Sequence, residues 1–236
     1  SRQATPVTIA EVLGLLPAAP VATTRDRGWG GVTVDLYGVI PDCSVRYSAF
    51  DHHVICYCTS GRSRMVQGRD GMLHENFTSA GMSLLMPAGS DSLWEGDIAA
   101  STRMRIPTAL VAAAAEQLGR RAASQFEIRN VFETRDPMIE HIAITLAIEL
   151  DRAAHPAQRL VIEAMSCTLA AHMLRSYNVF DVAGPPAHSK LGHAELAQIN
   201  DFIEDHVHRQ ISLAELAALV NVSRFHFTRL FRRSTG

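Results

Sequence analysis

Residues 212–236 read SLAELAALVNVSRFHFTRLFRRSTG, and the spacing of their side chains predicts two short helices around a tight turn. Ser212 and Glu215 form a capping box at the first helix, Asn221 tolerates a left-handed turn, and Ser223 caps the second helix. The apolar residues expected to form the core shared by the two helices are Leu216, Ala217, Val220, Val222, Phe227 and Leu230. This pattern is typical of a helix-turn-helix, whose second helix enters the major groove of DNA.

The charge of this segment differs from that of the whole chain. The 236 residues carry a formal net charge of -2, whereas residues 216–236 contain arginines and no acidic residue. Such a patch is expected of an element that contacts phosphates. The alternative interpretation is a structural helical hairpin with a solvated basic face.

The remaining sequence predicts an α+β protein of two domains. Residues 25–106 combine β-branched and aromatic runs with recurring glycines, which favours an antiparallel β-barrel or sandwich. Residues 107–180 have the periodicity and termini of helices, with Asp136 as an N-cap and Pro137 at the first helical position. We expect a sensing and dimerisation domain at 1–181, a linker at 182–193 rich in proline, glycine and small polar residues, and a DNA-binding domain at 194–236.

The third predicted helix, within residues 156–177, has apolar stripes on two opposite sides. One stripe contains Ile162, Met165, Leu169 and Met173. The other contains Leu160, Ala164, Cys167, Ala171 and Leu174. A helix that is apolar on both sides requires two packing partners, so we expect the second stripe to bind another subunit in a homodimer. The alternative is a central core helix in a monomer.

The C-terminal segment resembles the first helix-turn-helix of AraC/XylS-type transcription regulators. The matching residues of the recognition helix are Ser223, His226, Phe227, Arg229, Phe231, Arg232 and Gly236. The order of a β-rich effector domain, helices, a linker and a DNA-binding domain is also similar to that family. The family pattern continues with a second helix-turn-helix beyond the position of Gly236, so we expect this chain to carry only the first.

The resemblance implies double-stranded DNA as a partner and divides the recognition helix by role. Phe225, Thr228 and Arg229 are expected at base edges, where arginine pairs with guanine and an apolar ring contacts a thymine methyl group. Ser223, Arg224, Arg232 and Arg233 are expected at phosphates, which position the protein without specifying sequence.

The stretch GMSLLMPAGSDSLWEG, residues 81–96, resembles the second signature of cupin barrels through Gly81, Pro87 and Gly89. Ser92 stands where a metal-binding cupin has histidine, and the first cupin motif is not found. We therefore expect no metal and no cofactor. A rival metal site would use His52, Cys56 and Cys58, which share one strand face.

No nucleophile–base pair or phosphate loop is visible, so we expect no catalytic residues and no enzymatic activity. The barrel interior is instead expected to bind a small organic effector. Candidate lining residues are Trp29, Tyr37, Arg46, His53, Tyr57, Trp94, Arg103 and Arg105. Arg103 and Arg105 lie on one strand face, where they can clamp a carboxylate, although an outward orientation to solvent is the alternative.

Four scattered cysteines suit reduced thiols, and no membrane-spanning run or secretory signal is visible. We therefore expect a cytoplasmic, ligand-responsive transcription regulator. The alternatives are a cupin-type metal-dependent enzyme and a small-molecule-binding protein with an appended helical interaction domain.

Overall fold

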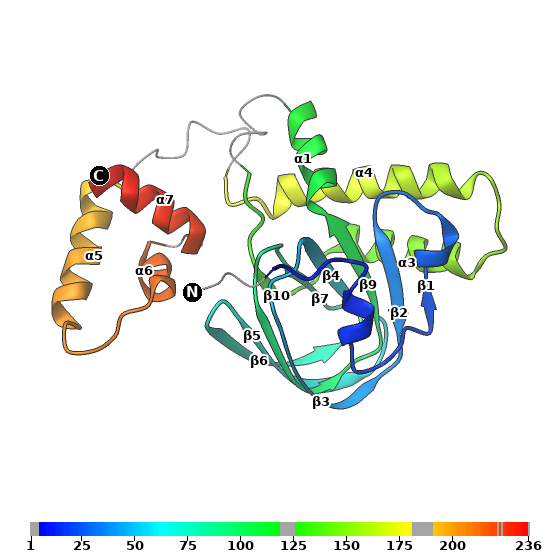
Figure 1. Ribbon diagram of the computed structural model, residues 1–236, viewed down its shortest axis with the longest axis horizontal. Coiled ribbons are helices and arrows are strands. Elements are labelled where there is room, and N and C mark those ends of the chain that lie inside the picture. The colour runs from blue at the N-terminus through cyan, green and yellow to red at the C-terminus, as the bar shows by residue number, and fades with distance from the viewer. Residues whose placement is uncertain (1–4, 119–125, 181–190, 221, 223, 236) are drawn as a thin grey trace. The chain divides into compact units, whose positions relative to one another are not determined.

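The computed structural model describes residues 5–118, 126–180, 191–220, 222 and 224–235 (Figure 1). The chain forms two compact units, residues 1–177 and 178–236. The sequence analysis placed the boundary between residues 181 and 182. Residues 182–190 of the expected linker lie outside the described residues, and helix α5 begins at His193, within the expected linker range.

The first unit is built from antiparallel strands in two sheets. The larger sheet has the order β1-β2-β9-β4-β7-β10 and the smaller has the order β3-β8-β5-β6. The strands are β1 (Ala22–Thr23), β2 (Thr33–Tyr37), β3 (Ile40–Tyr47), β4 (His52–Cys58), β5 (Arg62–Arg69), β6 (Met72–Ser79), β7 (Ser83–Met86), β8 (Ser92–Ile98), β9 (Ser101–Pro107) and β10 (Val131–Thr134). In the described residues, the strand ladders form these two sheets and do not close into one hydrogen-bonded barrel. The expected antiparallel α+β architecture, with a sheet-rich N-terminal region followed by helices, is confirmed.

The two sheets share one apolar core. It joins Val54 and Cys56 of β4 to Met65 of β5 and Trp94 of β8, and it also includes the fully buried Val12. Val12 begins a short 3-10 helix, Val12–Leu15, so the segment before the first strand contributes to this core. Alternate residues of the strands face the core, as the period of two in a β-strand requires.

Strand β4 is buried at every position. It lies between β9 and β7 in the larger sheet. Val54, Cys56 and Cys58 face the space between the sheets, whereas the Tyr57 hydroxyl donates a hydrogen bond to Glu140 Oε1 of helix α3 at 2.8 Å. Burial on both faces explains why the sequence of this strand does not alternate between apolar and polar residues.

Helices α1 (Thr108–Gln117) and α3 (Pro137–Asp151) pack beside the larger sheet, and α4 (Gln158–Ser176) packs against these two helices (Figure 1). The predicted N-cap is confirmed, because Asp136 Oδ1 accepts hydrogen bonds from the backbone N–H groups of residues 138 and 139. Asp136 Oδ2 also accepts from Tyr177 and from His172 Nε2. Burial acts to raise the pKa of Asp136, but these hydrogen bonds outweigh it and hold the pKa below its ordinary value.

Helix α4 buries one of its two predicted apolar stripes in the first unit. Ile162, Leu169 and Met173 have no exposed surface. On the other stripe Leu160 is 70% exposed and Cys167 is exposed, as are the two alanines 164 and 171. Leu174 does not belong to the exposed stripe, because only 1% of its surface is accessible.

The second unit contains α5 (His193–Asp205), α6 (Leu213–Leu219) and α7 (Arg224–Thr235). The predicted capping box is confirmed: Ser212 Oγ accepts from the Glu215 N–H at 3.2 Å, and the Ser212 N–H donates to Glu215 Oε2 at 2.8 Å. Ala217, Phe227 and Leu230 are buried in the core that the helices share. Asn221 and Ser223, to which the sequence assigned the turn and the second cap, lie outside the described residues.

Gly96 is a position where the fold requires glycine. Its φ is +103°, and an added Cβ would lie 2.5 Å from the Arg64 carbonyl oxygen on the neighbouring strand. We expect Gly96→Ala to lower the free energy of unfolding by about 2–4 kcal/mol, because backbone strain and a backbone clash combine. Gly38→Ala is the control, since a Cβ there meets nothing within 4 Å, and it should change stability by less than about 0.5 kcal/mol. Urea unfolding of both variants checks this, and equal losses would contradict it.

Candidate functional site

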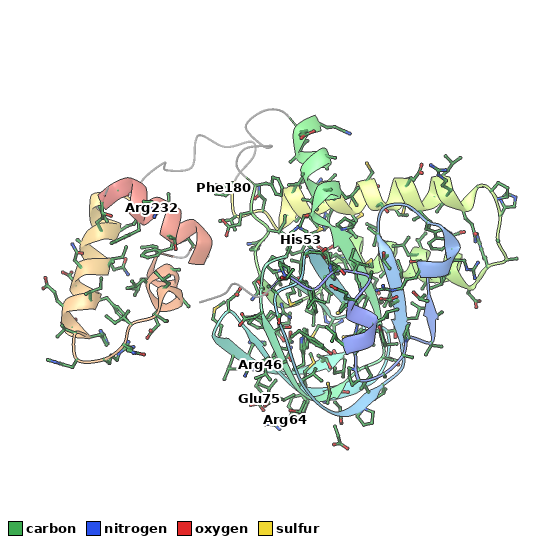
Figure 2. The ribbon with its side chains drawn as sticks, viewed as in Figure 1. Arg46, His53, Arg64, Glu75, Phe180 and Arg232 are labelled. Atoms are coloured by element: carbon green, nitrogen blue, oxygen red, sulfur yellow. The ribbon has the colours of Figure 1, made fainter. Side chains whose placement is uncertain are left out.

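Helix α7 has one face in the core of the second unit and another at the surface. Phe227, Leu230 and Phe231 pack against the core, and the rings of Phe227 and Phe231 stack with centroids 5.4 Å apart. Thr228 is exposed, and so is Arg232, which Figure 2 labels. The helix therefore presents Thr228 and Arg232 to solvent while its aromatic residues hold it in place.

The other predicted DNA-contacting residues are not described in this detail. Ser223 lies outside the described residues, as do the side chains of Phe225, Arg224, Arg229 and Arg233, although helix α7 includes the last four positions. Their predicted roles stay predictions.

A cavity lies between the two sheets of the first unit. Its volume is about 600 Å³, including the part that is open to solvent. The residues that line it are Leu16, Tyr47, Phe50, Val54, Cys56, Cys58, Met65, Thr78, Leu84, Met86, Trp94, Ile98, Ala99, Ser101, Arg103 and Arg105. Most are apolar, and no described lining residue is acidic.

The inner face of β9 supplies the polar part of this lining. Ser101, Arg103 and Arg105 occupy alternate positions of one strand, so all three point toward the cavity. Only 8% of the surface of Arg103 and 1% of that of Arg105 is accessible. The alternative of two solvent-exposed arginines on an outer face is therefore wrong.

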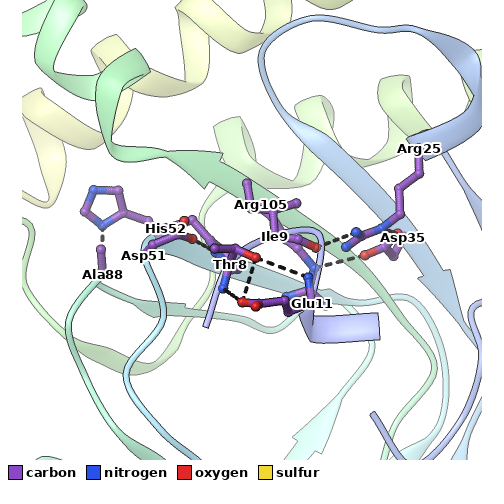
Figure 3. A network of polar contacts seen from close by, with 10 residues as sticks. Thr8, Ile9, Glu11, Arg25, Asp35, Asp51, His52, Ala88 and Arg105 are labelled. Atoms are coloured by element: carbon purple, nitrogen blue, oxygen red, sulfur yellow. Dashed lines mark hydrogen bonds and ion pairs between the residues drawn. The ribbon is translucent and has the colours of Figure 1, made fainter. Parts of the chain in front are cut away.

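Arg105 is held by a buried carboxylate (Figure 3). Its Nε donates to Asp35 Oδ2 at 3.0 Å, and Asp35 is fully buried. Asp35 Oδ1 also accepts from the Thr23 hydroxyl at 2.7 Å and lies 3.6 Å from Arg25 Nε. Arg25 in turn donates to the backbone carbonyl of Ile9. The network thus runs from the cavity wall to the segment that precedes the first strand.

Arg103 has a different environment. It lies opposite Asp35 in the β2–β9 ladder, but its guanidinium carbon is 4.2 Å from the centroid of the Tyr37 ring. Among the described residues, Arg103 Nε has no hydrogen-bond partner, and neither do the hydroxyls of Tyr37 and Tyr47. Burial raises the pKa of Tyr47 to about 12, although the charge of Arg103 acts to lower it.

The structure brings together some of the predicted effector-binding residues and separates others. Trp94, Arg103 and Arg105 line the cavity, and Tyr37 lies under Arg103. Trp29, Arg46, His53 and Tyr57 do not line it. Tyr57 faces Glu140, and Arg46 is exposed on the outer face of β3 (Figure 2).

His53 is occupied in a structural role. Its Nδ1 accepts a hydrogen bond from the Ala88 N–H at 3.0 Å, and burial lowers its pKa to about 4. The neighbouring His52 stacks on Phe50 with ring centroids 5.1 Å apart, and its Nδ1 lies 2.6 Å from Asp51 Oδ1. The adjacent histidines thus have different partners, as expected from their positions on opposite strand faces.

The rival metal site is not assembled in the described part of the chain. Cys56 and Cys58 are free thiols that face the cavity, whereas His52 pairs with Asp51. No cluster of three or more potential metal ligands occurs in residues 5–118, 126–180 and the described part of the second unit.

Sequence reasoning missed Asp35, Arg25 and Tyr47. An aspartate between Val34 and Leu36 in an apolar strand is a detectable signal of a buried charge pair, but its partner arginine is 70 residues away in sequence.

None of the described helices is both long and apolar enough to cross a membrane.

Residues 203–236, from the end of α5 through α7, match the family model for bacterial regulatory helix-turn-helix proteins of the AraC family. No curated protein matches the chain. Among solved structures, the AraC-like transcriptional activator CuxR aligns at 15% identity over 87% of this chain and 71% of its own, with a TM-score of 0.42.

A second similar structure is ToxT from Vibrio cholerae with a bound unsaturated fatty acid. It has 11% identity, covers 84% of this chain and 72% of its own, and has a TM-score of 0.41. Hydroxypropylphosphonic acid epoxidase from S. wedmorenis aligns at 12% identity over 33% of this chain and 43% of its own, with a TM-score of 0.26. The match to residues 203–236 is thus the one that carries weight.

The Asp35–Arg105 pair gives a test of how the cavity wall is stabilised. We expect Asp35→Asn to lower the free energy of unfolding by about 3–5 kcal/mol, because Arg105 would keep a buried charge without a partner. Glu75→Gln is the control, since Glu75 pairs with Arg64 at the surface, where both side chains are more than half exposed (Figure 2). It should cost about 0–1 kcal/mol. Thermal and urea unfolding measure both, and a stable Asp35→Asn protein would contradict the assignment.

Proposed function

We propose that this chain, whose residues 203–236 carry the helix-turn-helix of the AraC family, is a transcription regulator that binds specific DNA and responds to a small organic effector. The family match carries the DNA-binding part of the proposal, because it covers α6, α7 and the end of α5. In a helix-turn-helix the second helix enters the major groove, and α7 is that helix. Such a regulator acts in the cytoplasm, where bacterial DNA lies.

The DNA-facing side of α7 is inferred from its core side. Since Phe227 and Leu230 are buried, the groove must receive the opposite face, which includes the exposed Arg232. Positions 225 and 229 precede Arg232 by seven and three residues, a spacing that places them on the same face of an α-helix. We assign base contacts to Phe225, Thr228 and Arg229, and phosphate contacts to Ser223, Arg224, Arg232 and Arg233.

The effector site of this proposal is the cavity between the two sheets. Its lining is mostly apolar with a few convergent polar groups, which is the composition of small-molecule sites. An effector that binds one conformation of the protein more tightly than another can change the protein's affinity for DNA. By thermodynamic linkage, bound DNA then changes the affinity for the effector by the same factor. Within this lining we assign effector contacts to Trp94, Arg103 and Arg105.

Two arginines of α7 give separable predictions for DNA binding. We expect Arg232→Ala to weaken binding to all sequences alike and to reduce the slope of log affinity against log salt by about 1, because one phosphate contact is lost. Arg229→Ala should instead relax discrimination at one base pair by about 1–3 kcal/mol. Fluorescence anisotropy with the DNA upstream of the gene and with a scrambled duplex measures both quantities.

Arg64→Ala is the matched control, because Arg64 is an exposed arginine of the first unit. It should leave affinity, salt slope and specificity unchanged. If the full chain binds the upstream and scrambled duplexes equally at one salt concentration, the proposed sequence-specific regulator is wrong.

We also propose that the exposed stripe of α4 forms a homodimer. The stripe comprises Leu160, Ala164, Cys167 and Ala171, at spacings of four, three and four residues. Its small side chains allow another helix to approach closely, and Leu160 provides an exposed apolar anchor. Leu174 is excluded from this surface because it is buried within its own unit.

A charge placed on this stripe tests the dimer. We expect Ala164→Glu to raise the dimer dissociation constant at least about tenfold, because two carboxylates would be buried near the two-fold axis. The control Ala113→Glu changes an exposed alanine of α1 and should leave the dissociation constant unchanged. Sedimentation velocity across a concentration series measures it, and a wild-type chain that stays monomeric throughout would rule the dimer out.

A further inference from the structure

Hydrogen-bond donors without acceptors gather along one wall of the cavity. In the described structure the buried polar atoms of this wall without partners include Arg103 Nε, Ser101 Oγ and the hydroxyl oxygen of Tyr47. Ser101 lies directly opposite Tyr37 in the β2–β9 ladder, and Arg103 covers the Tyr37 ring. A buried polar group without a partner costs free energy, so a cluster of donors indicates a missing acceptor.

The two arginines of this wall differ in whether they have a carboxylate partner. The buried Asp35 carboxylate forms ion pairs with Arg105 and Arg25. Arg103 forms no ion pair with any described residue, although only 8% of its surface is exposed. A buried guanidinium of this kind is stabilised by an anion, and its planar donors match the two oxygens of a carboxylate.

The rest of the described lining is mostly apolar. Phe50, Val54, Leu84 and Met86 are buried core residues that also line it, and no acidic side chain belongs to the described lining. Burial of apolar ligand surface against such residues favours binding because that surface is removed from water. The cavity therefore favours a molecule with one anionic end and an apolar body.

We propose that the cavity binds an amphipathic monocarboxylate, with its carboxylate at Arg103 and the Tyr47 hydroxyl and its apolar body among Phe50, Val54, Leu84 and Met86. A phosphoryl group can carry two charges, and the described lining offers only Arg103 as an unpaired arginine because Arg105 is already paired with Asp35, so the second charge would be buried without a partner. The role of such a ligand as a regulator rests on the proposed function, whereas its binding requires only the cavity.

The test uses Trp94, which lines the cavity, as a fluorescent reporter. The chain has two tryptophans, and Trp29→Phe removes the other, which does not line the cavity. Full-length Trp29→Phe protein is titrated with decanoate below its micelle concentration, and with decan-1-ol and decylamine as neutral and cationic probes of similar length. We expect decanoate to bind at least about tenfold more tightly than decan-1-ol, and decylamine to bind least.

Arg103→Gln in the same background separates the charge from the apolar contacts. It should remove most of the preference for decanoate while decan-1-ol binds as before, and unchanged decan-1-ol binding also shows that the variant is folded. Arg46→Gln, at an exposed arginine of the smaller sheet, should preserve the preference. Should Arg103→Gln unfold, Arg103→Lys keeps the charge but loses the planar donors, and it should retain a weaker preference for decanoate.

Three results would overturn the proposal: equal binding of decanoate and decan-1-ol, an Arg103→Gln protein with undiminished preference, and failure of both decanoate and the shorter hexanoate to bind. The upstream-DNA titration on the same protein separates this proposal from the proposed function. Specific DNA binding without carboxylate binding removes only the ligand class. Carboxylate binding without specific DNA binding removes the regulator and leaves the ligand site.

Discussion

The buried carboxylate of Asp35 allows strand β9 to carry arginines into an apolar interior. Two unit charges of one sign on alternate positions of a buried strand would repel each other and lose their hydration. Asp35 offsets this cost at Arg105, with support from Thr23 and Arg25. Because Arg105 is occupied, Arg103 is, among the described residues that line the cavity, the cation that is free to meet a ligand. The position of the unpaired positive charge in the cavity thus depends on which arginine the Asp35 carboxylate pairs with.

Both units use apolar packing to fix the positions of polar side chains, but they place those side chains in different environments. In the second unit, aromatic and aliphatic residues such as Phe227 and Leu230 fix one face of a helix, so that polar residues of the opposite face meet solvent. In the first unit, β-strand alternation directs apolar and charged residues into one enclosed space. Arginine lies at the surface in the second unit, where salt and water screen its interaction with an anion. In the first unit it lies in the cavity lining, where the same interaction is poorly hydrated.

Much of the fold could be predicted from the sequence because the signals are local. The capping box at Ser212, the N-cap at Asp136 and the helix-turn-helix pattern each depend on residues within a few positions of one another. The antiparallel β-rich region was also predicted, but its division into two sheets was not, since strand order depends on pairings distant in sequence. Leu174 shows the limit of periodicity: it continues an apolar stripe of α4, yet it is buried in the core of the first unit.

The candidate site was predictable in kind but only partly in membership. Arg103, Arg105 and Trp94 were identified from strand position, whereas Tyr57 and His53 were assigned to a cavity that they do not line. Both residues are on the face of β4 away from the cavity, which sequence cannot orient because this strand has no polar face. Asp35 was missed since its importance arises only when β2 and β9 become neighbours.

The burial of β4 on both faces also has a consequence for sequence change. In β6, at the edge of the smaller sheet, exposed and covered positions are mixed, and Leu73 and Phe77 are more than half exposed. Such a strand has sites where drift is nearly neutral, because a new side chain meets solvent. In β4, Val54, Cys56 and Cys58 line the cavity, Tyr57 contacts helix α3 and His53 bonds the Ala88 N–H, so a substitution at these positions disturbs a buried contact. Leu16 and Ile98 also line the cavity but are only partly buried, so a change of ligand preference is more readily reached at these two positions.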